Sequence, residues 1–219
     1  MNKFLLILLS IFLTISIFGN VGENPYSTIK GKTLKYKNYY DGDKIGNATV
    51  TIHDDGFTYD NKFKIRAYLV FSYNYKSKIK VKFNNMGVTY VKSKTNNDGD
   101  KYKFTLNTKE GVLKKGKKEL KNFKGLSLGF IVSKKSRENL TSSWQTFKIL
   151  DIEKGKITKF KRKSAGTKTI KVNDKKYKTF MIKWVRGKRK GLSYYDVNTG
   201  ILVRSDVTKG GNTLIMKIQ

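Results

Sequence analysis

The sequence contains no cysteine, one proline and one histidine among 219 residues. Without cysteine there is no disulfide framework, no thiolate metal site and no cysteine nucleophile. A single histidine also excludes a zinc site built on several histidines. Acidic residues are scarce, because 16 Asp and Glu stand against 47 Lys and Arg, a formal net charge of +31. The 13 Tyr and 13 Phe nevertheless argue against a disordered chain, which would be poor in aromatic residues.

The first twenty residues differ from the rest of the chain. Lys3 gives a basic start, residues 4–18 are almost wholly apolar, and Gly19 is a small residue at their end. This order is typical of a secretory signal peptide, whereas a membrane-spanning helix needs about twenty apolar residues. We expect residues 1–20 to be a signal peptide, with an uncleaved N-terminal anchor as the alternative. Residues 21–28 then form a linker and residues 29–219 one periplasmic or secreted domain, with no transmembrane span after cleavage.

Lysine supplies most of the positive charge, since only six of the basic residues are arginines. Specific recognition of phosphates and bases favours arginine, so the composition argues against specific nucleic-acid binding. Frequent Lys, Asn, Ile and Tyr also fit the codon supply of an AT-rich genome. Two interpretations stay open: a solvated lysine surface, or attraction to an anionic surface of the cell envelope.

Alternation of polar and apolar residues predicts β-strands along most of the chain. In residues 78–83, for example, lysines alternate with Ile79, Val81 and Phe83. Asp- and Asn-rich turn signals, such as residues 54–56, separate the alternating runs. We predict an all-β protein of ten to twelve strands in an antiparallel meander. A sheet of this length must curve into a half-barrel or barrel-like shape to bury its apolar face.

Residues 123–145 interrupt this pattern. They combine an apolar run at residues 126–132 with a polar stretch at residues 136–140. A short helical or loop insertion fits better than a strand, and we expect this segment to act as a lid or plug.

Nothing in the sequence indicates catalysis. Eight of the sixteen acidic residues are aspartates in predicted turns, where aspartate bonds to the backbone. His53 meets carboxylates only at Asp54 and Asp55, where a hairpin corner is a better interpretation than a cation or acid–base site. The chain has no nucleophile elbow and no phosphate-binding loop. We expect no enzyme activity, no cofactor and no metal.

Two sets of residues are candidates for ligand contacts. The 28 aromatic residues, counting two tryptophans, are more than a small core needs, so an apolar cavity could hold a lipid or another amphiphile. Its candidate lining is Trp144, Phe180, Ile182 and Trp184. The second set is a basic hairpin that could contact an anionic headgroup or glycan; it comprises Arg186, Lys188, Arg189 and Lys190.

Five segments in order resemble a family of uncharacterised bacterial periplasmic domains of unknown function. They are GKTLKY at 31–36, DGDKIGNATV at 41–50, TNNDGDKY at 95–102, SSW at 142–144 and YYDVNTGILV at 194–203. The resemblance implies a fold similar to the lipoprotein-carrier half-barrels of the LolA and LolB type, in which a curved antiparallel sheet surrounds an apolar cavity. It implies no catalytic residues.

Overall fold

The computed structural model describes residues 29–67, 71–84, 87–109, 112–115, 117–120, 126 and 129–219. The expected signal peptide at 1–20 and linker at 21–28 therefore lie outside the described residues, as does part of the expected lid or plug. Within those described ranges, no helix has the length and hydrophobicity that crossing a bilayer requires.

The described residues form fourteen strands and one short helix, which confirms the all-β antiparallel prediction. The first eight strands are β1 (Thr33–Tyr40), β2 (Asp43–His53), β3 (Gly56–Ala67), β4 (Phe71–Asn84), β5 (Gly87–Asn97), β6 (Asp100–Lys109), β7 (Val112–Lys115) and β8 (Lys118–Leu120). The helix α1 (Lys134–Glu138) follows, and then β9 (Gln145–Asp151), β10 (Lys156–Val172), β11 (Lys175–Arg186), β12 (Arg189–Asp196), β13 (Leu202–Lys209) and β14 (Asn212–Ile218).

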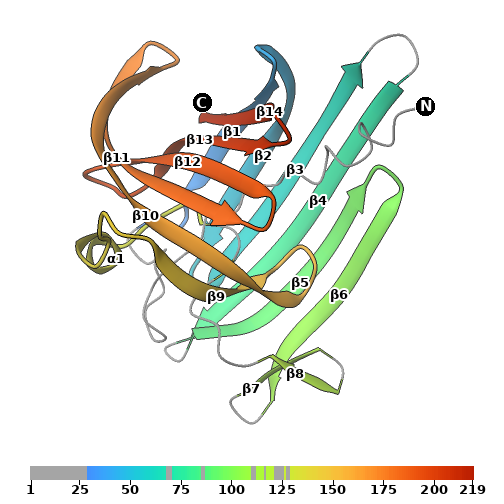
Figure 1. The fold of residues 1–219 in the computed structure, drawn as a ribbon. Coiled ribbons are helices and arrows are strands. Elements are labelled where there is room, and N and C mark those ends of the chain that lie inside the picture. Colours follow the sequence, from blue (N-terminus) through green and yellow to red (C-terminus); the bar gives the residue numbers. More distant parts are fainter. Residues whose placement is uncertain are drawn as a thin grey trace.

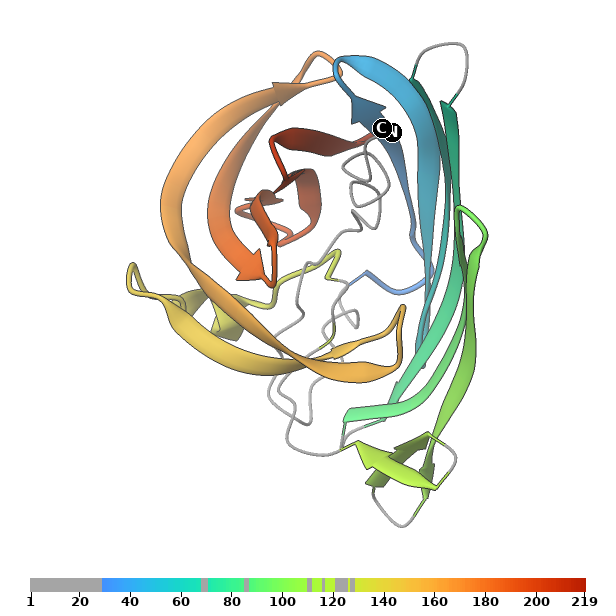
Figure 2. The same cartoon turned by 45° about the vertical axis from the view of Figure 1, so that its right-hand side comes forward.

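All fourteen strands belong to one sheet, in the order β8-β7-β6-β5-β4-β3-β2-β1-β14-β13-β12-β11-β10-β9. Neighbours in the sheet are neighbours in the sequence except at the β1–β14 pair, which joins the two ends of the described chain. The edges of the sheet are β8 and β9, so the sheet curves without closing. Strands β1–β6 form a long wall, and β9–β12 curl back across it (Figures 1 and 2).

Local chemistry explains the hairpins. Asn173 and Asp174 join β10 to β11 with φ angles of 48° and 66°. Two successive positive φ angles are typical of the type I′ turn, which matches the twist of the strands it joins and favours Asn, Asp and Gly. Along β4, residues 76–80 alternate between exposed lysines and the buried Ser77 and Ile79. The period-2 pattern thus determines which face of the sheet is exposed to solvent.

The concave side of the sheet holds two groups of buried apolar residues. The larger lies against β1–β5 and includes Tyr36, Phe57 and Tyr59. The smaller includes Tyr75 and Trp184, which come from the two opposite parts of the sheet. The core therefore joins the wall to the curled strands across the concave side.

Candidate functional site

Residues 129–132, here called the interior segment, lie inside the curved sheet. Phe130 has no exposed surface, and its ring centroid lies 5.2 Å from that of Tyr59, 5.7 Å from Tyr36 and 6.3 Å from Phe57. The side chains of Ile131 and Val132 are buried as well. A segment that belongs to no strand of the sheet thus fills its concavity.

Backbone bonds to the β12–β13 connection fix the interior segment. The Val132 N–H donates to the Gly200 carbonyl, and the Leu202 N–H donates to the Phe130 carbonyl, both at 2.9 Å. The Tyr195 hydroxyl donates to the carbonyl of Gly129 at 3.4 Å. At Gly200 the φ angle is +70°, and a Cβ there would lie 2.3 Å from the Val132 carbonyl oxygen. Only glycine therefore permits this close approach.

Three of the four predicted cavity residues face the core. Ile182 is buried in the larger apolar group, and Phe180 is half-buried with its ring stacked 5.2 Å from Tyr195. Trp184 is 1% exposed and donates its indole N–H to the Ser193 hydroxyl at 3.0 Å. These side chains pack against other side chains, and those of Ile182 and Trp184 belong to different apolar groups.

The placement of Trp144 in a cavity was wrong. Its side chain is 43% exposed, and the Lys163 ammonium lies 5.3 Å from its ring centroid. Trp144 directly precedes the edge strand β9, and its ring lies at the surface beside the Lys163 ammonium. The aromatic count alone could not distinguish this surface ring from the buried ones.

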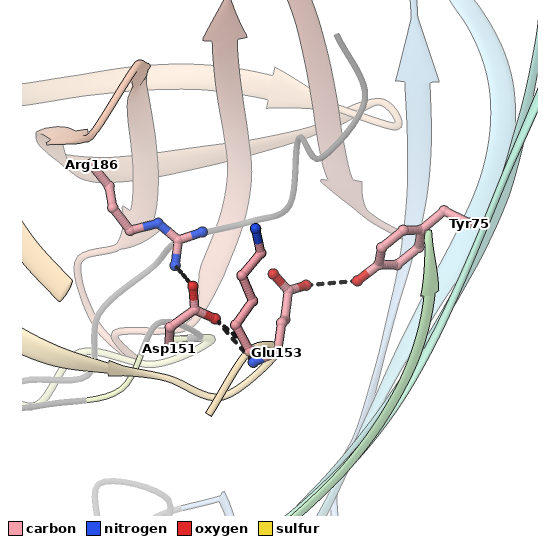
Figure 3. A network of polar contacts seen from close by, with 5 residues as sticks. Tyr75, Asp151, Glu153 and Arg186 are labelled. Carbon is pink, nitrogen blue, oxygen red and sulfur yellow. Dashed lines mark hydrogen bonds and ion pairs between the residues drawn. The ribbon is translucent and has the colours of Figure 1, made fainter. Parts of the chain in front are cut away.

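A cluster of buried charges lies between the wall and the curled strands (Figure 3). Arg186 Nη1 contacts Asp151 Oδ2 at 3.2 Å, and both side chains are 6% exposed. The Tyr75 hydroxyl donates to Glu153 Oε1 at 2.7 Å, which links β4 to the β9–β10 turn. With Arg189, which is also buried, these residues form what we call the seam cluster.

The β9–β10 turn holds the two acids in place. Asp151 Oδ1 accepts the backbone N–H groups of Glu153 and Lys154, each at 3.1 Å. Each oxygen of the Asp151 carboxylate therefore has a partner, one oxygen toward the turn and the other toward Arg186. Because every partner is supplied by the chain, the carboxylate is oriented as well as buried.

Desolvation dominates the electrostatics of the seam cluster. Burial raises the pKa of Glu153, with Asp151 adding to the rise, while Arg186 opposes it. Burial, and after it the neighbouring Arg186, lower the pKa of Arg189 to about 10. Two acids and two arginines leave the cluster formally neutral, which is the arrangement that buried charges require.

The four residues of the predicted basic hairpin differ in their exposure to solvent. Arg186 and Arg189 pair with each other across β11 and β12, and both are buried beside Asp151 and Glu153. Lys188 and Lys190 are exposed. The prediction of four solvent-facing anion contacts was therefore wrong for the two arginines, because strand alternation turns them inward. Their inward direction also places them next to Asp151 and Glu153.

A small pocket adjoins the seam cluster. Its volume is about 20 Å³, close to the space that a single water molecule requires. Its lining comprises Tyr75, Thr95, Asn97, Tyr102, Glu153, Lys154 and Arg189. Sites for drug-sized ligands are on the order of 300–1,000 Å³, so this pocket does not fit an organic substrate.

No cluster of metal ligands occurs among the residues that the structure describes. At the hairpin corner, His53 Nε2 lies 2.6 Å from Thr58 Oγ1, and Lys82 Nζ lies 2.6 Å from Asp55 Oδ2. His53 and Asp55 therefore both contact side chains of the neighbouring strands β3 and β4.

Lysines cover the outer face of strands β3–β6. Nine of them are exposed there, and we call this set the lysine array: Lys62, Lys64, Lys76, Lys78, Lys80, Lys92, Lys94, Lys101 and Lys103. Two acidic residues occur in β3–β6, Asp60 and Asp100, and Asp60 lies directly opposite Lys78. The array lies on the opposite side of the wall from the seam cluster, because Tyr75 and Lys76 point to opposite faces of β4.

The fold is that of a β-barrel-like protein. It is similar to a crystal structure described as a "Beta-barrel-like Protein of Domain of Unknown Function DUF1849 from Brucella abortus". The TM-score is 0.58 and the sequence identity 11%, over 85% of this chain and 95% of the other. At this identity the likeness shows the fold alone.

The family follows from the sequence itself. The profile described as "Domain of unknown function (DUF6134)" matches residues 36–219, so the chain belongs to this family. No protein of curated function matches the chain. These findings support the expectation of a family of unknown function, but they do not support the likeness to LolA and LolB.

Proposed function

We propose that the protein is an exported, non-enzymatic module that binds anionic surfaces of the cell envelope by charge. One observation carries this proposal: exposed lysines gather on the outer face of β3–β6. Inside the sheet, by contrast, the described residues of the interior segment are buried against other side chains, and the charges of the seam cluster balance one another. An outer surface of this kind attracts an anionic partner.

The expected strength of binding follows from the number of lysines. Each lysine close to an anionic membrane surface contributes about 1 kcal/mol, and the effect decays within a Debye length of about 10 Å at 0.1 M salt. A few array lysines in contact at once therefore suffice for measurable binding. Because the attraction is electrostatic, salt should weaken it steeply.

Vesicle sedimentation tests this proposal. The mature chain is mixed with vesicles of phosphatidylcholine alone, or with an added fraction of anionic phosphatidylglycerol, from low to physiological salt. We expect binding only to the anionic vesicles, with a steep loss as salt increases. Equal binding to both vesicle types, or binding that is insensitive to salt, would contradict the proposal.

The second candidate function is binding of an amphiphile in the interior, and it is favoured by the position of Phe130 in the chain. Phe130 belongs to a segment outside the strands, so its withdrawal would uncover Tyr36, Phe57 and Tyr59 without breaking the sheet. Mass spectrometry of organic extracts, from protein purified without detergent in high salt, tests this candidate. A near-stoichiometric lipid would support it. A blank extract, together with no lipid uptake after incubation with fatty acid, would contradict it.

A further inference from the structure

We infer that the lysine array on β3–β6 is the docking face, and that its partner is the anionic headgroup layer of a lipid bilayer. This inference rests on the proposed function, and it names both the surface and the partner. The argument uses the strand register, the shape of the wall and the chemistry of the side chains on it.

The strand register brings lysines directly opposite one another. Lys62 pairs with Lys76 between β3 and β4. Between β4 and β5, Lys78 pairs with Lys94 and Lys80 with Lys92. Lys94 also pairs with Lys103 of β6, which makes a row of three lysines across three strands. Asp60 of β3 lies opposite Lys78 at one end of this row, and it is the one acid there. Like charges directly opposite one another destabilise a sheet, so an external anion would offset the repulsion among the other lysines.

The array extends in two dimensions. It spans four neighbouring strands, which lie about 4.8 Å apart, and alternate positions along each strand, about 7 Å apart. Figure 2 shows β3–β6 as a gently curved wall, in contrast to the strongly curled β9–β12. A broad array on a nearly flat wall matches a charged surface better than it matches a single extended polymer.

The chemistry of the array favours headgroups over other anions. Its charged groups are lysine ammonium ions, with Arg66 near one end of β3. Single-stranded nucleic acid is usually held by stacking on exposed aromatic rings. Among the described residues the exposed large apolar side chain is Trp144, which precedes β9 and lies outside the array. The array is therefore suited to contact charge at a surface without inserting into it.

Acids neutralise basic side chains on both parts of the outer surface. On the curled part, Lys171 contacts Asp174 at 2.7 Å and Arg204 contacts Asp206 at 2.7 Å, while on the wall Lys82 of β4 contacts Asp55 at 2.6 Å. Exposed lysines are present on β10 and β11 as well, and they provide a matched control of equal charge.

Two quadruple variants test the docking face. In the array variant Lys78, Lys80, Lys92 and Lys94 are replaced by Gln. In the control variant the replaced residues are Lys168, Lys176, Lys178 and Lys183, which are equally exposed. Both variants lose four charges, so any difference in partitioning to phosphatidylglycerol vesicles reports position alone. Thermal melting checks that both fold, and the array variant should melt no lower than wild type because repulsion has been removed.

We expect the array variant to lose vesicle binding by up to about 600-fold, since each of its four lysines near an anionic bilayer contributes about a fivefold factor. The control variant should stay within about fivefold of wild type, because its side chains remain away from the bilayer. Equal losses in the two folded variants would overturn the docking face but leave charge-driven binding intact. Absence of wild-type binding both to the anionic vesicles and to a soluble sulfated glycan would instead overturn the proposed function.

The anionic groups could belong to a lipid bilayer or to a polymer, and binding of a soluble sulfated glycan distinguishes these two partners. If it bound wild type with the same sensitivity to the array substitutions while vesicles did not bind, a polymer and not a bilayer would be the partner. That result would overturn the inference about headgroups. Competition by the glycan at high concentration, with vesicle binding retained in its absence, supports it.

Discussion

Removal of the positive charge of Arg186 should destabilise the fold strongly. The Arg186→Met substitution keeps much of the side-chain volume but leaves Asp151 and Glu153 buried with Arg189 as the remaining cation of the seam cluster. The Arg186–Asp151 contact is 3.2 Å long, and each side chain is 6% exposed. Water therefore cannot replace the lost partner without a rearrangement of the β9–β10 turn.

Breaking a buried ion pair by removing one partner costs about 3–5 kcal/mol. For a domain of 150–250 residues, each kcal/mol corresponds to about 2–4 °C in the melting temperature, so a decrease of roughly 6–20 °C is expected. The double variant Arg186→Met with Asp151→Asn should lose less, because no unpaired charge remains. The asparagine oxygen can still accept the N–H groups of Glu153 and Lys154.

Urea denaturation followed by tryptophan emission measures these effects. Trp184 is 1% exposed and Trp144 is 43% exposed, so the change in emission on unfolding comes chiefly from Trp184. A loss below about 1 kcal/mol for Arg186→Met would refute the reasoning, because it would place the pair in the range of solvent-exposed salt bridges. So would a double variant less stable than the single one.

Three further predictions concern the interior. Phe130→Ala should cost about 3–5 kcal/mol, measured by urea denaturation, because a fully buried ring is removed; a loss under 1 kcal/mol would mean that the interior is not tightly packed. Burial raises the pKa of Glu153 in the folded state, so its ionisation costs stability as the pH rises through that value. The wild type should therefore lose stability relative to Glu153→Gln as the pH rises from below the ordinary pKa of 4.5 to neutral; a urea-denaturation series in which the wild type instead gains stability relative to the variant would contradict this. Gly200→Ala should destabilise more than Gly210→Ala, since both have positive φ but only the first would place its Cβ against a backbone carbonyl; equal melting temperatures would contradict this.

Much of the fold could be predicted because strands leave a local signal. The alternation in β4 and the Asn173–Asp174 turn are readable from a few residues. The boundary between β3 and β4 could not be read, because residues 57–83 contain no Asn- or Gly-rich turn signal near Ala67. The strand count expected from the sequence was therefore lower than the fourteen described strands.

The seam cluster was out of reach because it depends on contacts between distant residues. Tyr75 and Glu153 are 78 positions apart, and the sequence around either residue does not predict its contact with the other. One signal was available: two of only six arginines stand three residues apart in the β11–β12 hairpin. Arginine is the residue suited to buried ion pairs, so this choice in a lysine-rich chain hinted at an inward role.

The seam cluster also explains how an unclosed sheet can protect its interior. A closed barrel removes its edges by pairing the last strand with the first. Here polar and backbone contacts span the gap instead: Tyr75 bonds to Glu153, and Lys115 of β7 donates to the Lys154 carbonyl at 3.4 Å. Strand alternation lets β4 contribute to both sides, because Tyr75 faces the seam while Lys76 faces the solvent. The outer lysines are consequently free of any part in closing the sheet, so the charge they present can be altered without opening the core.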